Sequence, residues 1–222
     1  MPLLDTLHGN LVHSRRVRVL ADRLAELIPA AATVLDVGCG DGLLASLIMA
    51  RRPDVRVEGI DVLVRPATHV PVRAFDGQHI DAPDGGFDVV MFVDVLHHTD
   101  DPEVLLREAA RVARSCVIIK DHTRDGLLAG PTLRFMDWVG NARHGVALPY
   151  NYWPRARWER AIASLGLRVE AWDARIGIYP WWARWVFERK LHYVARLGVR
   201  KPGATEESGE ESGSSLSAPN PA

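Results

Sequence analysis

Three glycines and two acidic residues share one short segment, Val34-Leu-Asp-Val-Gly-Cys-Gly-Asp-Gly42. Glycines at these positions let the backbone turn tightly and approach a ligand without side-chain obstruction. The carboxylates of Asp36 and Asp41 make the segment a poor host for a diphosphate and favour a cationic ligand. A third carboxylate, Asp61, follows Gly42 by 19 positions, where it can accept hydrogen bonds from both hydroxyls of a ribose. The segment therefore predicts a binding loop for a positively charged nucleoside.

The spacing of the glycines separates two classes of nucleotide cofactor. The nicotinamide fingerprint is G-x-G-x-x-G, whose glycines bring the backbone against a pyrophosphate. Here the spacing is G-x-G-x-G, and Leu43 stands where that fingerprint needs a glycine. An NAD-dependent oxidoreductase stays open as an alternative, because an acid in the place of Asp61 would serve either cofactor.

Two adjacent histidines, His97 and His98, follow an apolar run and are the candidate catalytic residues. An imidazole there could take a proton from an acceptor, since its unperturbed pKa lies near neutrality. The alternative is that both form a pocket wall or a capping contact. Asp121 and His122 are a second candidate pair. A metal site built from these four residues and Asp94 is conceivable, but its spacing matches no standard ligand pattern, so we expect no metal.

Alternating strand and helix patterns must position these residues. After a helix expected over 9–28, strands are expected over 33–37, 55–60, 70–75, 87–93 and 116–120, with helices over 42–51 and 102–113 between them. The alternation predicts an α/β fold with a doubly wound parallel sheet covered on both faces. Ligands of such sheets bind outside the carboxyl ends of the strands.

The alternation breaks after residue 120. Residues 121–153 are rich in glycine, proline and aromatic residues, and we expect them to form an ordered, irregular cap over the substrate, with a helical piece near 133–139. A packed subdomain without substrate contact is the alternative. The expected acceptor contacts are His122, Asn141, His144, Tyr150 and Tyr152. Beyond the cap we expect a helix over 154–165, a strand over 167–174 paired as a hairpin with 175–179, and a final helix over 181–197.

The expected final helix combines aromatic and basic side chains, namely Trp181, Trp182, Trp185 and Phe187 with Arg184, Arg189, Lys190 and Arg196. Such a helix packs either on the sheet or against a second subunit, so a monomer and a homodimer both stay open. A second interpretation is an interfacial helix lying on lipid, which would give peripheral membrane contact through residues 181–197.

The composition excludes several classes of protein. The 222 residues include 27 basic and 28 acidic ones, so the basic surplus of a duplex-binding protein is missing and no nucleic acid partner is expected. Two cysteines imply no disulfide framework. Without a leader pattern or an 18-residue apolar run, the expected location is the cytoplasm. We expect residues 1–200 to form one domain and the acidic, Ser- and Gly-rich residues 201–222 to be a disordered tail.

Four segments in register resemble the motifs of class I S-adenosylmethionine-dependent methyltransferases. They are Val34–Gly42, Glu58-Gly-Ile-Asp-Val62, Phe75-Asp-Gly-Gln78 and Phe87-Asp-Val-Val-Met-Phe-Val-Asp-Val-Leu-His-His98, the last being similar to the small-molecule subgroup called type 11. The resemblance covers roughly residues 30–120 and more loosely 154–174. It implies a Rossmann-like, mostly parallel seven-stranded sheet with a C-terminal antiparallel hairpin, an N-terminal helix and an irregular cap between strands 5 and 6.

The resemblance also implies the cofactor, S-adenosyl-L-methionine, and the residues that would bind it. Asp36, Gly38 and Gly40 would surround the methionine part, and Asp94 would lie near the methionyl end. The ribose and adenine contacts would come from Asp61, Val62, Asp76 and Gly77. Simple turns and capping acids are the alternative roles of these residues.

These patterns together predict transfer of a methyl group from S-adenosylmethionine to a small-molecule acceptor by in-line displacement. Members of the family that methylate amino groups or DNA adenine carry Asn/Asp-Pro-Pro-Tyr after the fourth strand. This chain has Val93-Asp-Val-Leu-His-His98 there, so an oxygen or carbon acceptor is favoured, with a lipid, quinone or saccharide intermediate among the candidates. A non-catalytic cofactor-binding partner subunit is the other alternative.

Overall fold

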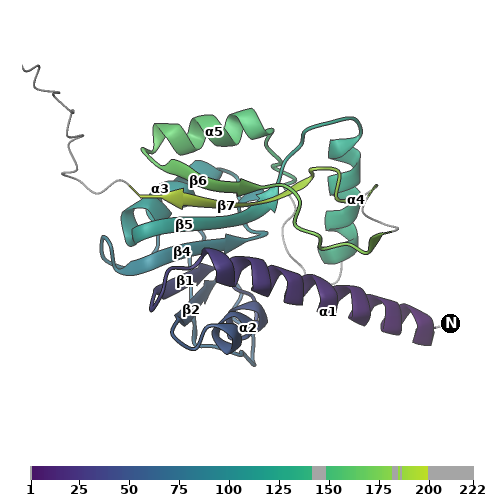
Figure 1. Cartoon of the computed structure of the whole chain (residues 1–222), viewed down its shortest axis with the longest axis horizontal. Coiled ribbons are helices and arrows are strands. Elements are labelled where there is room, and N and C mark those ends of the chain that lie inside the picture. Colours follow the sequence, from purple (N-terminus) through teal and green to yellow (C-terminus); the bar gives the residue numbers. More distant parts are fainter. Residues whose placement is uncertain (1, 142–148, 182–184, 186, 200–222) are drawn as a thin grey trace, which may run out of the picture.

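Seven strands form one mixed sheet (Figure 1). The computed structural model describes residues 2–141, 149–181, 185 and 187–199, and its strand order is β3-β2-β1-β4-β5-β7-β6. The strands are β1 (Thr33–Val37), β2 (Arg56–Asp61), β3 (Val72–Ala74), β4 (Phe87–Val93), β5 (Ala113–His122), β6 (Arg168–Asp173) and β7 (His192–Gly198). Strands β1 to β5 pair in parallel, whereas β7 runs antiparallel to β5 and β6. The strand order reverses between β1 and β4, which is the place where doubly wound sheets bind their ligands.

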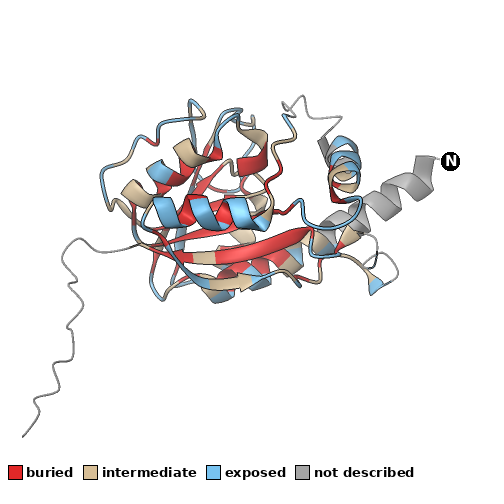
Figure 2. Ribbon diagram, turned by 90° about the horizontal axis from the view of Figure 1, so that it is seen from above, coloured by how far each residue is buried: buried red, intermediate tan, exposed pale blue. Residues whose placement is uncertain are grey.

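Helices cover both faces of the sheet (Figure 2). They are α1 (Pro2–Leu27), α2 (Leu43–Arg51), α3 (Pro102–Val112), α4 (Ala129–Asn141) and α5 (Arg155–Ser164), with a short 3-10 helix, η1, at Leu96–His98. Because side chains alternate across a strand, β4 sends Val90 and Phe92 into a core shared with α3 and α5, and Val89 and Met91 into a core shared with α1 and α2. The doubly wound, mostly parallel α/β fold expected from the sequence is confirmed.

Two residues at the start of α3 explain where this helix begins. Asp101 caps α3, its carboxylate accepting a hydrogen bond from the Glu103 N–H at 3.0 Å. Pro102 occupies the first turn, where its missing N–H costs nothing. The connection between β4 and α3 is therefore short, and it holds η1 directly at the carboxyl end of β4.

The C-terminal hairpin is present, but its second strand is not the expected one. Residues 175–179 form no strand, and β6 pairs instead with β7, in the register Trp172 to Ala195. The expected helix over 181–197 is wrong for its second half, because residues 192–197 belong to β7. A strand inserted between two others is buried on both faces, so β7 lacks the polar and apolar alternation by which a strand is recognised.

The expected cap lies between β5 and α5 and contains α4. The carboxyl ends of β4 and β5 are at the same end of the sheet as this connection (Figure 1). Residues 142–148 and the expected tail, 201–222, lie outside the described residues, so the extent of the domain and the disorder of the tail stay predictions. Among the described helices, none is both long and apolar enough to cross a bilayer.

Candidate functional site

The loop after β1 has the backbone geometry that its glycines predict. Gly38 and Gly40 have φ angles of +74° and +62°, in the left-handed region that glycine adopts without strain. A Cβ atom on Gly38 would lie 2.5 Å from the Val95 side chain, so no larger residue fits. A Cβ atom on Gly40 would have no heavy atom within 4 Å. The backbone at Gly40 therefore faces open space into which a ligand can fit closely.

Two carboxylates lie at this loop. Asp61 accepts hydrogen bonds from the N–H groups of Gly40 and Leu63, each at 2.8 Å. Asp36 is buried, and burial together with the negative charge of Asp61 raises its pKa to about 7. The negative potential of the pair favours a cation in front of the loop.

The next two predicted contacts lie at the ends of β2 and β3. The side chain of Val62 is 68% exposed, and a Cβ atom on Gly77 would lie 3.5 Å from it. Asp76 is exposed, and its carboxylate accepts hydrogen bonds from the N–H groups of Gln78 and His79, each at 2.7 Å. Val62 and the turn at Asp76 therefore lie side by side and can border a flat base. We call Asp36, Gly38, Gly40, Asp61 and Asp76 the glycine edge.

The glycine edge fits S-adenosylmethionine. The open space in front of the Gly40 backbone leaves room for the cofactor. Asp61 lies at the loop where a ribose would bind, and the apolar, exposed Val62 beyond it suits the base. The charge of Asp61 and the partial charge of Asp36, whose pKa is about 7, give a negative potential that suits a sulfonium and would oppose a pyrophosphate. The individual contacts proposed for these residues stay predictions.

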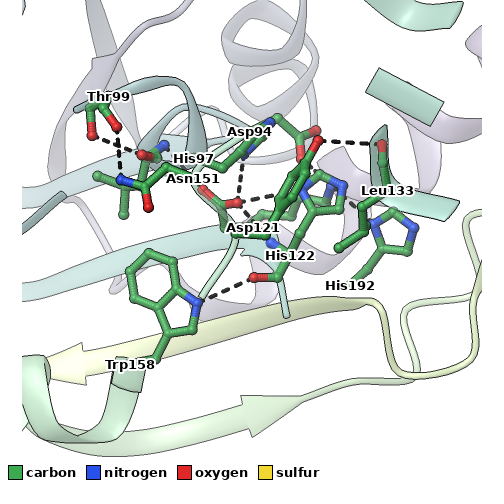
Figure 3. Close-up of polar contacts among 12 residues, drawn as sticks. Asp94, His97, Thr99, Asp121, His122, Leu133, Asn151, Trp158 and His192 are labelled. Atoms are coloured by element: carbon green, nitrogen blue, oxygen red, sulfur yellow. Dashed lines mark hydrogen bonds and ion pairs between the residues drawn. The ribbon is translucent and has the colours of Figure 1, made fainter. Parts of the chain in front are cut away.

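A second group of polar residues lies at the carboxyl ends of β4 and β5. We call Asp94, His97, Lys120, Asp121 and His122 the histidine edge (Figure 3). Figure 3 shows the side chains of Asp94, His97, Asp121 and His122 turned toward one another, with His192 of β7 beside them, and Lys120 contacts Asp94. Four of the five are at least nine-tenths buried, and the Asp94 side chain is 23% exposed. Buried polar groups are stable only when they are paired, so their contacts define the site.

Asp94 is held between two cations. Its carboxylate contacts the ammonium of Lys120 on one oxygen and accepts a hydrogen bond from the Arg16 guanidinium at 2.6 Å on the other. Its φ angle of +58° is unusual for a residue other than glycine. Burial would raise the pKa of Asp94, but the charges of Lys120 and Arg16 outweigh it and hold that pKa well below the usual value. Asp94 is therefore an anion at neutral pH.

Asp121 orients His97. The Nδ1 atom of His97 lies 2.7 Å from Oδ1 of Asp121, whose carboxylate also accepts hydrogen bonds from the N–H groups of Leu96 and His122. Burial opposes ionisation of Asp121, but the neighbouring histidines and these hydrogen bonds lower its pKa. In neutral His97 the proton then sits on Nδ1 and the lone pair on Nε2, which is the tautomer of a general base.

Two further histidines of this region, His122 and His192, are uncharged at neutral pH. Burial and the charge of Lys120 lower the pKa of His122 to about 4 and hold that of His192 well below its usual value. The Nε2 atom of His192 lies 3.1 Å from the Phe187 carbonyl, so Nε2 is the donor and Nδ1, 3.5 Å from the Lys120 nitrogen, is the acceptor. Because both histidines are uncharged, they add no positive charge next to the buried Lys120 ammonium.

Part of the cap lies over His97. The Tyr152 ring stacks on the His97 ring with centroids 5.4 Å apart, and its hydroxyl donates a hydrogen bond to the Leu133 carbonyl of α4 at 3.3 Å. The Asn151 N–H donates to the His97 carbonyl at 3.2 Å. The structure thus brings His122 and Tyr152 to His97, with half-buried Tyr150 6.4 Å from Tyr152 between ring centroids.

The side chains of two expected acceptor contacts lie outside the described part of the structure. One of them is Asn141, whose backbone ends α4. His144 lies outside the described residues. Their roles stay predictions.

Three of the five candidate metal ligands come together. One donor atom from each of His97, Asp121 and His122 lies within 4.8 Å of the others. The buried Lys120 ammonium next to them opposes a metal cation. Hydrogen bonds from backbone and ring N–H groups already occupy Asp121, so these three residues are better described as a hydrogen-bonded network.

Sequence reasoning missed Arg16, Lys120 and His192. The one local signal was Lys120 itself, a lysine that directly continues the apolar run Cys116-Val-Ile-Ile119. A lysine in a buried strand needs a charge partner, and this could have suggested Asp94. Arg16 is 78 residues from Asp94, so no local pattern could reveal that pair.

Comparisons with known proteins agree with the geometry of the glycine edge. A family model described as "Methyltransferase domain" matches residues 12–171. Two curated relatives are the 27-O-demethylrifamycin SV methyltransferase of Amycolatopsis mediterranei, 36% identical with 50% of each chain covered, and the ubiquinone biosynthesis O-methyltransferase of Sodalis glossinidius, 31% identical with 36% of each chain covered. The chain thus spans half or less of the length of these relatives.

Solved structures show the same fold at low sequence identity. A geranyl diphosphate methyltransferase in complex with SAM superposes with a TM-score of 0.62 at 13% identity, covering 82% of this chain and 85% of that one. A SAM-dependent methyltransferase from Aquifex aeolicus gives 0.56 at 18% identity, covering 81% and 88%. The family match overturns the NAD-dependent alternative. This chain belongs to the class I S-adenosylmethionine-dependent methyltransferases.

Proposed function

We propose that the protein methylates a hydroxyl oxygen of a small molecule, with His97 as the general base. The contact between His97 Nδ1 and Asp121 Oδ1, 2.7 Å long and fully buried, carries this proposal. A hydroxyl is protonated at neutral pH, so its methylation benefits from a base, whereas a carbon acceptor that is already nucleophilic needs none. Because Asp121 contacts His97, the base role falls to His97 rather than to His98, which lies 4.0 Å from it between ring centroids.

The cofactor supplies a methyl group bonded to a sulfonium, which is activated for direct displacement. The residues of the chain must then hold the acceptor in line and exclude water. His97 Nε2 accepts the hydroxyl proton as the oxygen forms its bond to the methyl carbon. Asp121 stabilises the imidazolium that results. His97 is 1% exposed, so the acceptor reaches it only when the cap residues around Tyr152 move aside.

The names of the curated relatives include an oxygen acceptor and also a nitrogen acceptor, the latter in the ajmaline N-methyltransferase of Rauvolfia serpentina. One is named as a ubiquinone biosynthesis O-methyltransferase, and another as a 27-O-demethylrifamycin SV methyltransferase. A third, from Synechocystis, is named as a 2-methyl-6-phytyl-1,4-hydroquinone methyltransferase, at 30% identity over 59% of this chain and 39% of its own length. These names support phenols and hydroquinones, including isoprenoid ones, as the first acceptors to test.

A donor-turnover screen tests the proposal. The protein is incubated with S-adenosylmethionine and panels of phenols, hydroquinones, aliphatic alcohols, amines and carbon nucleophiles, and release of the demethylated cofactor is measured. We expect turnover with a hydroxyl acceptor and a loss of about 1,000-fold in His97→Gln. His98→Gln should lose far less, and the exposed His79 provides a matched control as His79→Gln.

Three outcomes would contradict the proposal. Turnover confined to carbon or amine acceptors would rule out the hydroxyl. Equal losses in His97→Gln and His98→Gln would remove the assignment of the base. Cofactor binding without turnover of any panel would support a non-catalytic partner subunit; the fold alone does not decide this, since one matched structure is described as a [4+2]-cyclase.

A further inference from the structure

Two segments at one end of the molecule expose large apolar side chains to solvent. The turn before α4 and α4 itself expose Leu127, Leu128, Phe135 and Trp138, and the segment before β7 exposes Trp181 and Trp185. The exposed fractions run from 55% for Phe135 to 86% for Leu127. Single exposed apolar residues are ordinary, but large ones gathered on two neighbouring segments mark an interaction surface. We call these six residues the apolar end.

Direct contacts hold the two segments together. The Thr123 N–H donates a hydrogen bond to the Leu191 carbonyl at 3.0 Å, and the Arg189 guanidinium donates to the Thr132 hydroxyl at 3.3 Å. Leu133 of α4 packs with Leu191 in one small core. Figures 1 and 2 both show α4 and the segment that leads into β7 at the same end of the sheet.

Exposed cations surround the apolar end. Arg124 precedes the turn, Arg134 lies on α4 with its guanidinium over the Tyr150 ring, and Lys190 follows the second segment. Arg189 is exposed as well. Exposed tryptophan and leucine side chains bordered by arginine and lysine are the composition of a surface that lies in the headgroup region of a bilayer.

We propose that the apolar end binds the surface of an anionic lipid bilayer. The apolar side chains would enter the boundary between headgroups and acyl chains, while Arg124, Arg134 and Lys190 would contact anionic headgroups. A second copy of the chain is a poorer occupant, since a two-fold contact through this end would bring the same cations face to face. Residues 191–195 are buried in or beside β7, so the contact involves the segment before Leu191 and not the whole of 181–197.

The apolar end adjoins the histidine edge. Leu133, on the same helix as Phe135 and Trp138, accepts the hydrogen bond from Tyr152, whose ring covers His97. Contact with a bilayer would therefore place lipid beside the cap. Lipid binding itself is independent of the proposed methyl transfer and can be measured without any acceptor.

Vesicle sedimentation tests this proposal with the full chain. Vesicles of phosphatidylcholine alone are compared with vesicles that also contain phosphatidylglycerol. We expect binding to the anionic vesicles, weaker binding at high salt, and a blue shift of tryptophan fluorescence in the bound state. The double variant Leu127→Ser/Trp181→Ser should lower the partition coefficient by about tenfold or more. Val169 on β6 is also partly exposed, so Val169→Ser is the matched control and should bind as the original chain does.

Three outcomes would overturn the proposal. One is failure to bind anionic vesicles at low salt. The second is an equal loss in Leu127→Ser/Trp181→Ser and Val169→Ser. The third is a dimer, detected by light scattering, that the double variant dissociates while neither form binds lipid, because the apolar end would then join two copies. Calorimetric binding of the cofactor by each variant shows that its fold is intact, and it separates failure of this proposal from failure of the proposed catalysis.

Discussion

The glycine edge and the histidine edge lie at the same end of one sheet but are built in opposite ways. The glycine edge is local: β1, its loop and the end of β2 supply Gly38, Gly40 and Asp61, and backbone conformation does most of the positioning. The histidine edge is assembled from the end of β4, η1 and β5 with Arg16 of α1 against it, and most of its contacts join side chains from different elements. The difference shows that one end of the sheet combines a region positioned by its own backbone with a region that depends on contacts between distant elements.

The comparison predicts that a substitution in one edge leaves the function of the other edge unchanged. The largest loss of methyl transfer should come from Asp121→Asn. An amide cannot stabilise an imidazolium at His97, so we expect methyl transfer to fall about 1,000-fold, or roughly 4 kcal/mol in barrier. Cofactor affinity, measured by calorimetric titration, should stay within about threefold. Asp125→Asn on the exposed turn is the control. Loss of cofactor binding in Asp121→Asn would mean that the two edges are not separable.

Removing the buried lysine should cost stability rather than cofactor contacts. Lys120→Met leaves the partly buried Asp94 carboxylate without its lysine partner and with the Arg16 contact still in place, so we expect the unfolding free energy to drop by about 3 kcal/mol. Urea denaturation measures it. Lys190→Met on the surface should change it little. The double variant Lys120→Met/Asp94→Asn should recover part of the loss, and a purely additive result would show that the pair is not coupled.

Asp36 should give the glycine edge a pH dependence. Its pKa is raised to about 7 in the folded chain, whereas the unfolded chain loses that proton near the ordinary aspartate value of 3.8. Between these values the folded state binds more protons, so the unfolding free energy of the cofactor-free chain should fall as pH rises. From pH 5 to pH 7 the fall should be about 2 kcal/mol.

Comparison with Asp36→Asn isolates this contribution. The amide cannot titrate, so the variant should lack that part of the pH dependence in urea denaturation. An identical pH dependence in both proteins would mean that Asp36 is already ionised at pH 5.

The smallest expected effect concerns the ribose contact. Asp61→Asn keeps the shape of the side chain but loses its charge, so cofactor affinity should weaken about tenfold, or roughly 1.4 kcal/mol. The turnover rate at saturating cofactor should change little. Asp100→Asn, exposed and beyond η1, is the control. If Asp61→Asn instead lowered the turnover rate at saturating cofactor and left cofactor affinity unchanged, Asp61 would act in catalysis and not in cofactor binding.

The sequence predicts an edge well when the residues that interact there are close together in the chain, and poorly when they are far apart. Glycine spacing, the acid 19 positions later and the strand patterns predicted the loop after β1 and the doubly wound sheet, because each depends on neighbours in the chain. The strand His192–Gly198 could not be predicted, since its burial on both faces arises only from insertion between β5 and β6.

The sequence by itself determined the fold class and the cofactor, since backbone turns at glycine and the alternation of strand and helix are local properties. Only the tertiary structure decided that Arg16 and Lys120 hold Asp94 and that His192 lies beside Lys120. It also decided that Asp121 selects His97 from two adjacent histidines. The physical reason is that buried charges need partners at hydrogen-bond distance, and the fold brings those partners together from positions 78 residues apart for Arg16 and Asp94 and 72 for Lys120 and His192.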